Sequence, residues 1–162
     1  MLYCKGKGRE LRKESSGSKI EIRKLRIKDY GRMLEVWKSA GLAFKPKGRE
    51  SRISISKQMK ETPELFLGAF REDTLVGVIV GSSEGKRKGW LNRIAVLPQM
   101  RGQGIAKKLT WAAEKELKKM GIGIIGLLIE KSNKTSIKLA KSLGYKVHTN
   151  ILYLTKRESE DV

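Results

Sequence analysis

A glycine-rich stretch in the second half of the chain, PQMRGQGIAKK at residues 98–108, limits the fold more than any other feature. It directly follows the apolar run IAVL at 94–97, which indicates the end of a strand. It opens a pattern of apolar residues at Ile105, Leu109 and Ala113, which is typical of one helical face. A strand, a glycine turn and a helix in this order present free backbone N–H groups that can bind an anion such as phosphate. The chain is therefore expected to be an α/β protein with an anion site at this turn.

Two common phosphate-binding motifs do not match this turn. A P-loop requires a lysine and a hydroxyl residue directly after its second glycine, but Gly104 is followed by Ile105. A dinucleotide-binding turn requires a third glycine where this chain has Lys107. The literal match GIGIIG at 121–126 runs from a helix end into a strand, whereas the motif must run from a strand into a helix. We interpret GIGIIG as a helix end followed by a crowded strand.

The rest of the chain shows alternating strand and helix patterns. The first half is expected to contain a strand at 19–27, a helix at 29–41 capped by Asp29, a segment at 49–62 that fits a helix or a strand but is favoured as a short helix by its place between a loop and Pro63, and antiparallel strands at 64–70, 74–83 and 89–97. The second half is expected to contain a helix at 104–120, a buried strand at 123–130, a helix at 133–144, and closing strands at 145–147 and 151–156. This order predicts one α/β domain over residues 19–157.

The stretch WLNRIAVLPQMRGQGIAKKL resembles motif A of the GNAT-type N-acetyltransferases, whose pattern is [RQ]-x-x-G-x-[GA]. The pattern fits from Gln99 to Gly104 and from Arg101 to Ala106, and we take the second fit because the family motif begins a few residues past the strand proline. N…LGY, from Asn133 to Tyr145, extends the resemblance, which covers about residues 19–156. VWKSAGL and GSSEGKRKGWLN are similar to a subgroup of small microbial GNAT proteins whose substrates are mostly unassigned. The resemblance implies a GNAT acyl-CoA N-acyltransferase fold, a mixed and mostly antiparallel sheet flanked by helices.

The resemblance also implies acetyl-CoA as cofactor and names the residues that would hold it. The strand before the turn splays from its neighbour in the family, and its backbone pairs with the pantetheine arm, while residues 126–128 form the other side of the opening. Asn133 matches an asparagine that reaches the cofactor arm, although a plain helix cap explains it equally well. The implied cofactor-binding residues are Ile94, Ala95, Val96, Arg101, Gly102, Gln103, Gly104, Ile105, Ala106, Lys107 and Asn133.

Two acid–base groups that many family members use are missing. The usual tyrosine position in the last helix is Ala140, and the usual acidic position on the strand before Asn133 is Leu128. We therefore consider three other candidates. They are Asn92, placed by strand alternation on the same face as Ile94; Glu84, which would accept a proton through water; and Tyr153 on the last strand.

The charge of the chain bears on its partners. A net charge of +19 suggests acidic partners, but the cations are spread along the whole chain, and aromatic residues are only 6%, so nucleic acid is expected to bind only nonspecifically. Repulsion between like charges argues against polyamine substrates. An acidic protein partner fits the charge, and the chain is expected to be a monomer or homodimer.

Composition also sets the expected compartment and the terminal segments. No apolar run is long enough for a membrane span and no signal sequence is recognised, so a cytoplasmic location is expected. One cysteine and one histidine do not favour a metal site. Residues 1–18 are expected to form a flexible basic tail and 158–162 a C-terminal tail.

The predicted function is an acetyl-CoA-dependent N-acetyltransferase that transfers the acetyl group directly to a primary amine. The acceptor is a protein N-terminus, a lysine or a small-molecule amine. The absence of the usual acid–base groups at Leu128 and Ala140 keeps a non-catalytic acyl-CoA-binding or regulatory module as the alternative. A nucleic-acid-associated basic protein ranks third.

Overall fold

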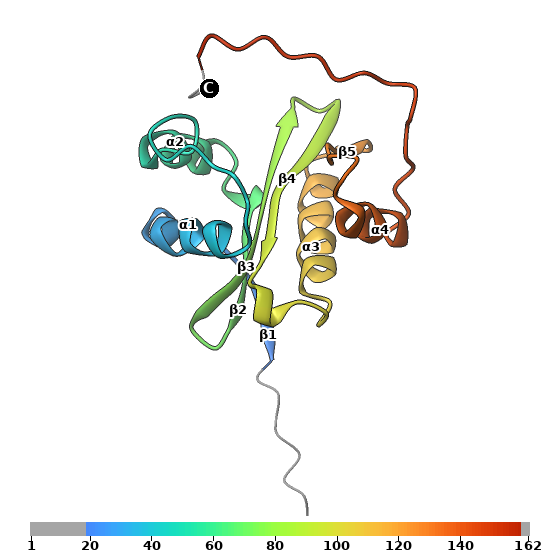
Figure 1. Cartoon of the computed structure of the whole chain (residues 1–162). Coiled ribbons are helices and arrows are strands. Elements are labelled where there is room, and N and C mark those ends of the chain that lie inside the picture. Colours follow the sequence, from blue (N-terminus) through green and yellow to red (C-terminus); the bar gives the residue numbers. More distant parts are fainter. Residues whose placement is uncertain (1–18, 160–162) are drawn as a thin grey trace, which may run out of the picture.

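One sheet forms the centre of the molecule. The structure is a computed structural model and describes residues 19–159. Within that range the strands are β1 (Ile20–Lys24), β2 (Phe66–Arg71), β3 (Thr74–Glu84), β4 (Lys88–Val96) and β5 (Ile125–Leu127). They are ordered β1-β2-β3-β4-β5, the first four antiparallel and β5 parallel to β4 (Figure 1). The mixed, mostly antiparallel sheet expected from the sequence is confirmed.

Helices cover both faces of this sheet. They are α1 (Tyr30–Ser39), α2 (Arg52–Glu61), α3 (Ile105–Lys119) and α4 (Lys134–Ser142), with short 3-10 turns η1 (Ile27–Asp29), η2 (Pro63–Leu65) and η3 (Pro98–Met100). α1 and α2 lie on one side of the sheet, and α3 and α4 lie on the other (Figure 1). No helix within residues 19–159 is both long and apolar enough to cross a lipid bilayer.

The ends of these helices follow the sequence with one exception. α2 is helical, and Ser51 caps it by accepting a hydrogen bond from the Ser54 amide at 3.3 Å. Gly121 adopts a left-handed φ of +81° just past α3, as a C-terminal glycine should. Asp29 precedes α1 but its side chain makes no capping bond. Its carboxylate instead accepts from the Arg26 amide at 3.0 Å.

Two apolar clusters lie on the two faces of the sheet. On one face Met33, Val36 and Trp37 of α1 are buried at helical spacing against β2 and β3. On the other face the helix pattern of α3, including Leu109 and Leu117, is buried against β2, β3 and β4. A residue of the sheet can therefore be assigned to a face by the cluster that it joins.

The C-terminal part differs from the expectation. No strand follows α4 within the described residues, so the closing strands predicted at 145–147 and 151–156 are wrong. The strand predicted at 123–130 forms only over Ile125–Leu127 and is half-buried. Its apolar composition predicts burial by neighbouring strands, and β5 has such a neighbour on one side only. The predicted tail at 1–18 lies outside the described residues, as do residues 160–162.

Candidate functional site

The pairing between β4 and the edge strand β5, the two parallel strands of the sheet, ends at a defined position. β5 pairs with β4 through Gly89↔Ile125, Trp90↔Gly126 and Leu91↔Leu127, and the pairing ends there. From Asn92 onward β4 continues to pair with β3, while its other edge has no strand partner in the described chain. The opening expected beside residues 94–96 is therefore present, and it begins at Asn92.

The glycine turn lies just beyond this free edge and leads into α3. Gly102 and Gly104 have left-handed φ values of +77° and +73°, a conformation that side chains with a Cβ disfavour. A Cβ at either position would meet no heavy atom within 4 Å. Gly104 makes no side-chain cap, and the first bond of the helix runs from the Lys108 amide to the Gly104 carbonyl. The first amides of α3 therefore have no intrahelical partner.

Arg101, the first residue of the matched motif, is engaged within the protein. Its backbone amide donates to the Pro98 carbonyl at 3.3 Å. Its guanidinium donates to the carbonyls of Val96 and Ala40, each at 3.3 Å. The amides that remain for an anion therefore begin at Gly102, one residue later than expected.

The side chains that follow Arg101 have separate roles. Gln103 accepts a hydrogen bond from Arg71 at 2.8 Å, which ties the turn to the end of β2. The Ile105 side chain is buried in the core, so only its backbone can serve an anion. The ammonium of Lys107 lies 4.6 Å from the centre of the exposed Trp111 ring. The glycine backbone and the helix end, rather than a cluster of free cations, define this site.

A bulge in β4 corrects the placement of Asn92. Val78 pairs with Ala95 and Val80 pairs with Asn92, so β4 carries one extra residue, and Arg93 adopts a left-handed φ of +54°. Asn92 lies opposite Val80 on the α1 and α2 face, where its amide is 3.5 Å from the Ser82 hydroxyl. Ile94 packs on the α3 face. The prediction that both side chains share a face is wrong because a bulge interrupts strand alternation.

The sequence reasoning missed a buried carboxylate beside this bulge. Glu50, in the loop between α1 and α2, is 4% exposed and accepts from the Lys45 amide at 2.6 Å and from Arg49 at 2.8 Å. It also forms an ion pair with Arg93, whose other terminal nitrogen donates to the Ala43 carbonyl. Burial lowers the pKa of the Arg93 guanidinium, and the charge of Glu50 opposes that shift.

No local signal marks Glu50 as special, because an acidic residue in a basic loop resembles any solvated charge. The sequence does not indicate the positive φ of Arg93 either, because Arg93 lies in a run of strand-forming residues. Only the fold brings these two residues together, 43 positions apart, at the start of the opening.

The other predicted catalytic residues are dispersed. Glu84 ends β3 and accepts from the Trp90 indole at 2.8 Å. It lies four residues along β3 from the partner of Asn92, which is about 13 Å at about 3.3 Å per residue. Tyr153 is 71% exposed in the segment that follows α4. The structure therefore does not bring Asn92, Glu84 and Tyr153 together within one chain.

Asn133 caps α4 as predicted, and Ala140 and Leu128 occupy the two positions where acid–base groups are missing. The Asn133 side-chain oxygen caps α4 by accepting from the Ser136 amide at 3.1 Å, which leaves its NH₂ group for another partner. Ala140 is buried and Leu128 is exposed, and neither carries a proton-transferring group. The phenol of Tyr145, just after α4, donates a hydrogen bond to the Glu114 carboxylate at 2.7 Å. Burial, with help from this bond, raises the pKa of Tyr145.

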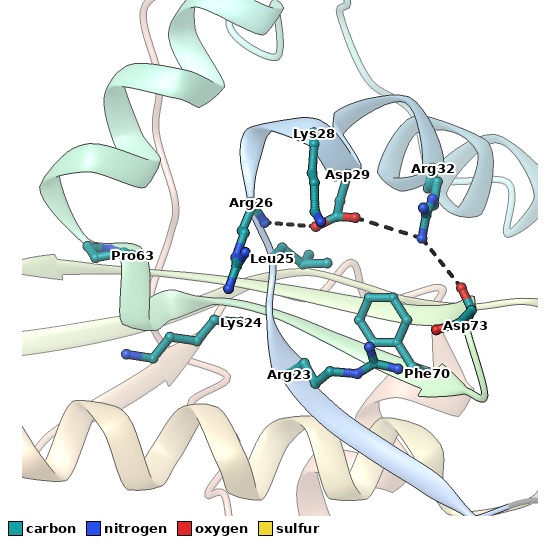
Figure 2. Close-up of a pocket in the computed structure, with 10 residues that line it drawn as sticks. All are labelled: Arg23, Lys24, Leu25, Arg26, Lys28, Asp29, Arg32, Pro63, Phe70 and Asp73. Carbon is teal, nitrogen blue, oxygen red and sulfur yellow. Dashed lines mark hydrogen bonds and ion pairs between the residues drawn. The ribbon is translucent and has the colours of Figure 1, made fainter.

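Positive charge gathers in a separate pocket of about 690 Å³ at the β1 edge of the sheet (Figure 2). Its lining includes five cations and two acids, namely Arg23, Lys24, Arg26, Lys28, Arg32, Asp29 and Asp73. In Figure 2 Arg32 reaches both Asp29, at 3.8 Å, and the Asp73 carbonyl, at 3.4 Å. This edge is opposite to the β4–β5 opening in strand order, so the pocket is distinct from the predicted cofactor site.

Comparison with known proteins agrees with this geometry. The sequence model of the "Acetyltransferase (GNAT) family" matches residues 27–145. An acetyltransferase of Sodalis glossinidius (strain morsitans) is 32% identical over 142 residues, which are 88% of this chain and 98% of that protein.

Solved structures extend the comparison to the fold. The PaiA N-acetyltransferase of Thermoplasma acidophilum, crystallised with coenzyme A, superposes with a TM-score of 0.73 at 27% identity, over 82% of this chain and 93% of that one. An aminoglycoside N-acetyltransferase in complex with CoA superposes with a TM-score of 0.69 at 19% identity, over 88% and 98% of the two chains. At that identity the second likeness concerns the fold alone.

Proposed function

The chain belongs to the acetyltransferase (GNAT) family, and on this basis we propose that it transfers an acetyl group from acetyl-CoA directly to a primary amine. The observation that carries the proposal is the β4–β5 opening, which begins at Asn92 and leads to the uncapped N-terminus of α3. Acetyl-CoA supplies an activated thioester, a diphosphate and an extended pantetheine arm. The amine is acylated without a covalent enzyme intermediate.

Residues of the opening match two of these parts, the diphosphate and the pantetheine arm. The amides from Gly102 to Lys107 donate to the diphosphate, and the helix dipole favours its negative charge. Ile94, Ala95 and Val96 offer a free strand edge for the pantetheine amides, because β4 has no partner on that side within the described residues. The Asn133 NH₂ group, which α4 capping does not use, contacts the same arm.

The bulge at Arg93 supplies polarity where the reacting carbonyl would lie. A bulge takes backbone groups out of the ladder, so an N–H near Arg93 can stabilise negative charge that develops on the carbonyl oxygen. The charge of Arg93 is balanced by Glu50, but the Arg101 guanidinium is held by carbonyls, and its charge disfavours a second positive charge nearby. Arg101 therefore favours the neutral form of the acceptor amine, which is the form that attacks.

The three candidate residues have unequal roles, and only Glu84 and Tyr153 carry a group that can transfer a proton. Asn92 contacts the acceptor on the α1 and α2 face of β4. Glu84 lies too far from Asn92 to take a proton directly from an acceptor bound there. It acts only through water, at the end of the β3–β4 hairpin. Tyr153 protonates the leaving thiolate only if the exposed segment that carries it moves to the β4–β5 opening.

The acceptor class follows from charge. A protein N-terminus, a lysine on an acidic protein or a small metabolite amine fits a chain of net charge +19 better than a polyamine does. We propose that the reaction takes place in the cytoplasm. Nucleic acid binds to this chain only nonspecifically, through its positive charge.

The test combines binding and turnover. Calorimetric titration with acetyl-CoA is followed by thiol release with a panel of acidic peptides, lysine peptides, small amines and polyamines. Binding with turnover on peptides or small amines supports the proposal. Binding without thiol release from any acceptor favours the non-catalytic acyl-CoA module, which Leu128 and Ala140 would then explain. Absence of acetyl-CoA binding contradicts both.

A further inference from the structure

The β1 edge of the sheet carries backbone groups that no strand of the described chain uses. The Leu25 amide donates to the Phe66 carbonyl at 2.8 Å, which fixes the side of the chain that faces β2. By alternation in this register, the N–H and C=O groups of Ile22 and Lys24 point to the opposite side. β1 is the first strand in the sheet order, so no strand within residues 19–159 lies on that side. The edge can therefore accept one more strand.

The two faces of β1 differ in chemistry. Ile20 and Ile22 belong to the apolar cluster on the α3 face and are only half-buried. Arg23 points to the α1 and α2 face, where its guanidinium lies 4.1 Å from the centre of the Phe70 ring (Figure 2). A strand added beside β1 would thus have apolar neighbours on one face and the cationic pocket on the other. A matching sequence would alternate apolar and acidic residues.

Two cations at the end of β1 have no acidic partner. Three other cations of the pocket lie within ion-pair distance of an acid, in the pairs Arg23–Glu21, Lys24–Glu64 and Arg32–Asp29. Arg26 and Lys28, which follow β1, form no ion pair with any residue of the described chain. Asp73 lies at the other end of the pocket, beside Phe70 (Figure 2). Positive charge is therefore unbalanced where β1 ends.

The unbalanced charge continues across η1 to α2. A second pocket, of about 420 Å³, is lined by Ile27 of η1 and by residues of α2. Its lining contains three cations and no acid, and these cations form no ion pair within residues 19–159. The η1 basic surface consists of the five cations without an acidic partner, namely Arg26, Lys28, Arg52, Lys57 and Lys60. Charge complementarity favours an acidic occupant for this surface.

We propose that an extended acidic segment of a partner protein adds to the free edge of β1, with its acidic side chains on the η1 basic surface. Main-chain hydrogen bonds to Ile22 and Lys24 would supply affinity, and the charges would select the partner. A nucleic acid fits this edge less well, because its backbone has no N–H donors for the strand carbonyls. The β1 edge is opposite to the β4–β5 opening in strand order, so this docking is separate from acetyl transfer.

The first test is fluorescence anisotropy with the full chain and labelled octapeptides at about 0.15 M salt. A peptide of alternating glutamate and valine should bind. Glutamine in place of each glutamate should weaken binding about tenfold, and so should the same residues grouped into one acidic and one apolar block. Equal binding of either control peptide overturns the proposal. A single-stranded DNA octanucleotide that binds more tightly than the alternating peptide overturns it in favour of nucleic acid.

Amide hydrogen exchange, followed by NMR with and without the alternating peptide, tests the pairing itself. The amides of Ile22 and Lys24 should exchange about tenfold more slowly in the complex, because they gain strand partners. The Leu25 amide should change little, since it already donates to Phe66 in the free protein. Peptide binding without new protection of Ile22 and Lys24 overturns strand addition at this edge.

A pair of double variants tests the η1 basic surface. Arg26→Gln/Lys28→Gln should weaken binding of the alternating peptide about tenfold. Both side chains are exposed and form no ion pair, so the fold should persist, which urea denaturation verifies. The matched control is Lys115→Gln/Lys118→Gln, which removes the same charge from exposed positions of α3, on the other side of the sheet (Figure 1). The control should bind like wild type, and equal affinities for the two double variants contradict the proposal.

Discussion

Gly104→Glu is the substitution that most directly tests the anion site. Gly104 has a φ of +73° and open space around the position of a Cβ, so a new side chain meets no protein atom. Its protein-side cost is the left-handed conformation, about 1 kcal/mol of folding free energy. Its ligand-side cost is electrostatic. A carboxylate about 6 Å from one phosphate charge, at an effective dielectric constant of about 40, is repelled by about 1.4 kcal/mol.

That repulsion corresponds to about a tenfold loss of acetyl-CoA affinity, measured by calorimetric titration. Gly104→Gln has the same length without the charge, so the difference between the two variants isolates the electrostatic part. Gly121→Glu is the matched control for strain, because Gly121 has a φ of +81° and equally open surroundings. It lies past the far end of α3, about 22 Å away at about 1.5 Å for each of 15 residues.

Gly104→Glu and Gly121→Glu should rank in opposite order for acetyl-CoA affinity and for the free energy of unfolding. A carboxylate at the N-terminus of α3 interacts favourably with the helix dipole and one at the C-terminus does not, a difference of about 0.3–1 kcal/mol each. In urea denaturation, Gly104→Glu should therefore be the more stable of the two glutamate variants, and in calorimetry the weaker binder. Equal acetyl-CoA affinities for Gly104→Glu and Gly121→Glu would falsify the assignment of the turn to the diphosphate.

Three further outcomes are expected. Glu50→Ala should cost about 3 kcal/mol of unfolding free energy in urea, because the half-buried guanidinium of Arg93 loses its ion pair; a loss near zero would contradict a structural role for that pair. Gly126→Ala should cost about 1–2 kcal/mol in the same assay, since its Cβ would lie 2.7 Å from the Trp90 ring, while Gly123→Ala meets nothing and serves as control. Because burial and the Glu114 bond raise the folded-state pKa of Tyr145 above its unfolded value near 10, its contribution is full below about pH 10 and is lost as pH rises further. Tyr145→Phe should therefore lose less stability than wild type between about pH 9 and 11, and equal losses would rule this out.

The order of elements was predictable up to α4 because local patterns decide it. The helix pattern from Ile105, the stop at Gly121 and the hairpin at 71–74 each depend on a few neighbouring residues. The C-terminal strands were not predictable in the same way. Ile151–Leu154 has the composition of a strand, but a strand forms only where an unpaired edge is within reach, and composition does not report reach.

The conformation of the candidate site was predictable where the backbone requires a particular residue. Left-handed positions 102 and 104 require glycine, so the sequence shows the turn directly. The bulge at Arg93 requires no special residue, and it reversed the face assigned to Asn92. Patterns of period two cannot detect one inserted residue, because each half of the strand still alternates correctly.

The contacts of Arg93 and Arg101 connect the β4 bulge and the glycine turn to the loop between α1 and α2. Arg93 holds the Ala43 carbonyl and Glu50, over 50 and 43 positions in sequence, and Arg101 holds the Ala40 carbonyl over 61 positions. The loop between α1 and α2 is thus fastened at one point to the bulge and at another to the turn that precedes α3. A diphosphate at the turn would attract the Arg101 guanidinium and draw it from the Ala40 carbonyl, whereas Arg93 would still hold the Ala43 carbonyl and Glu50.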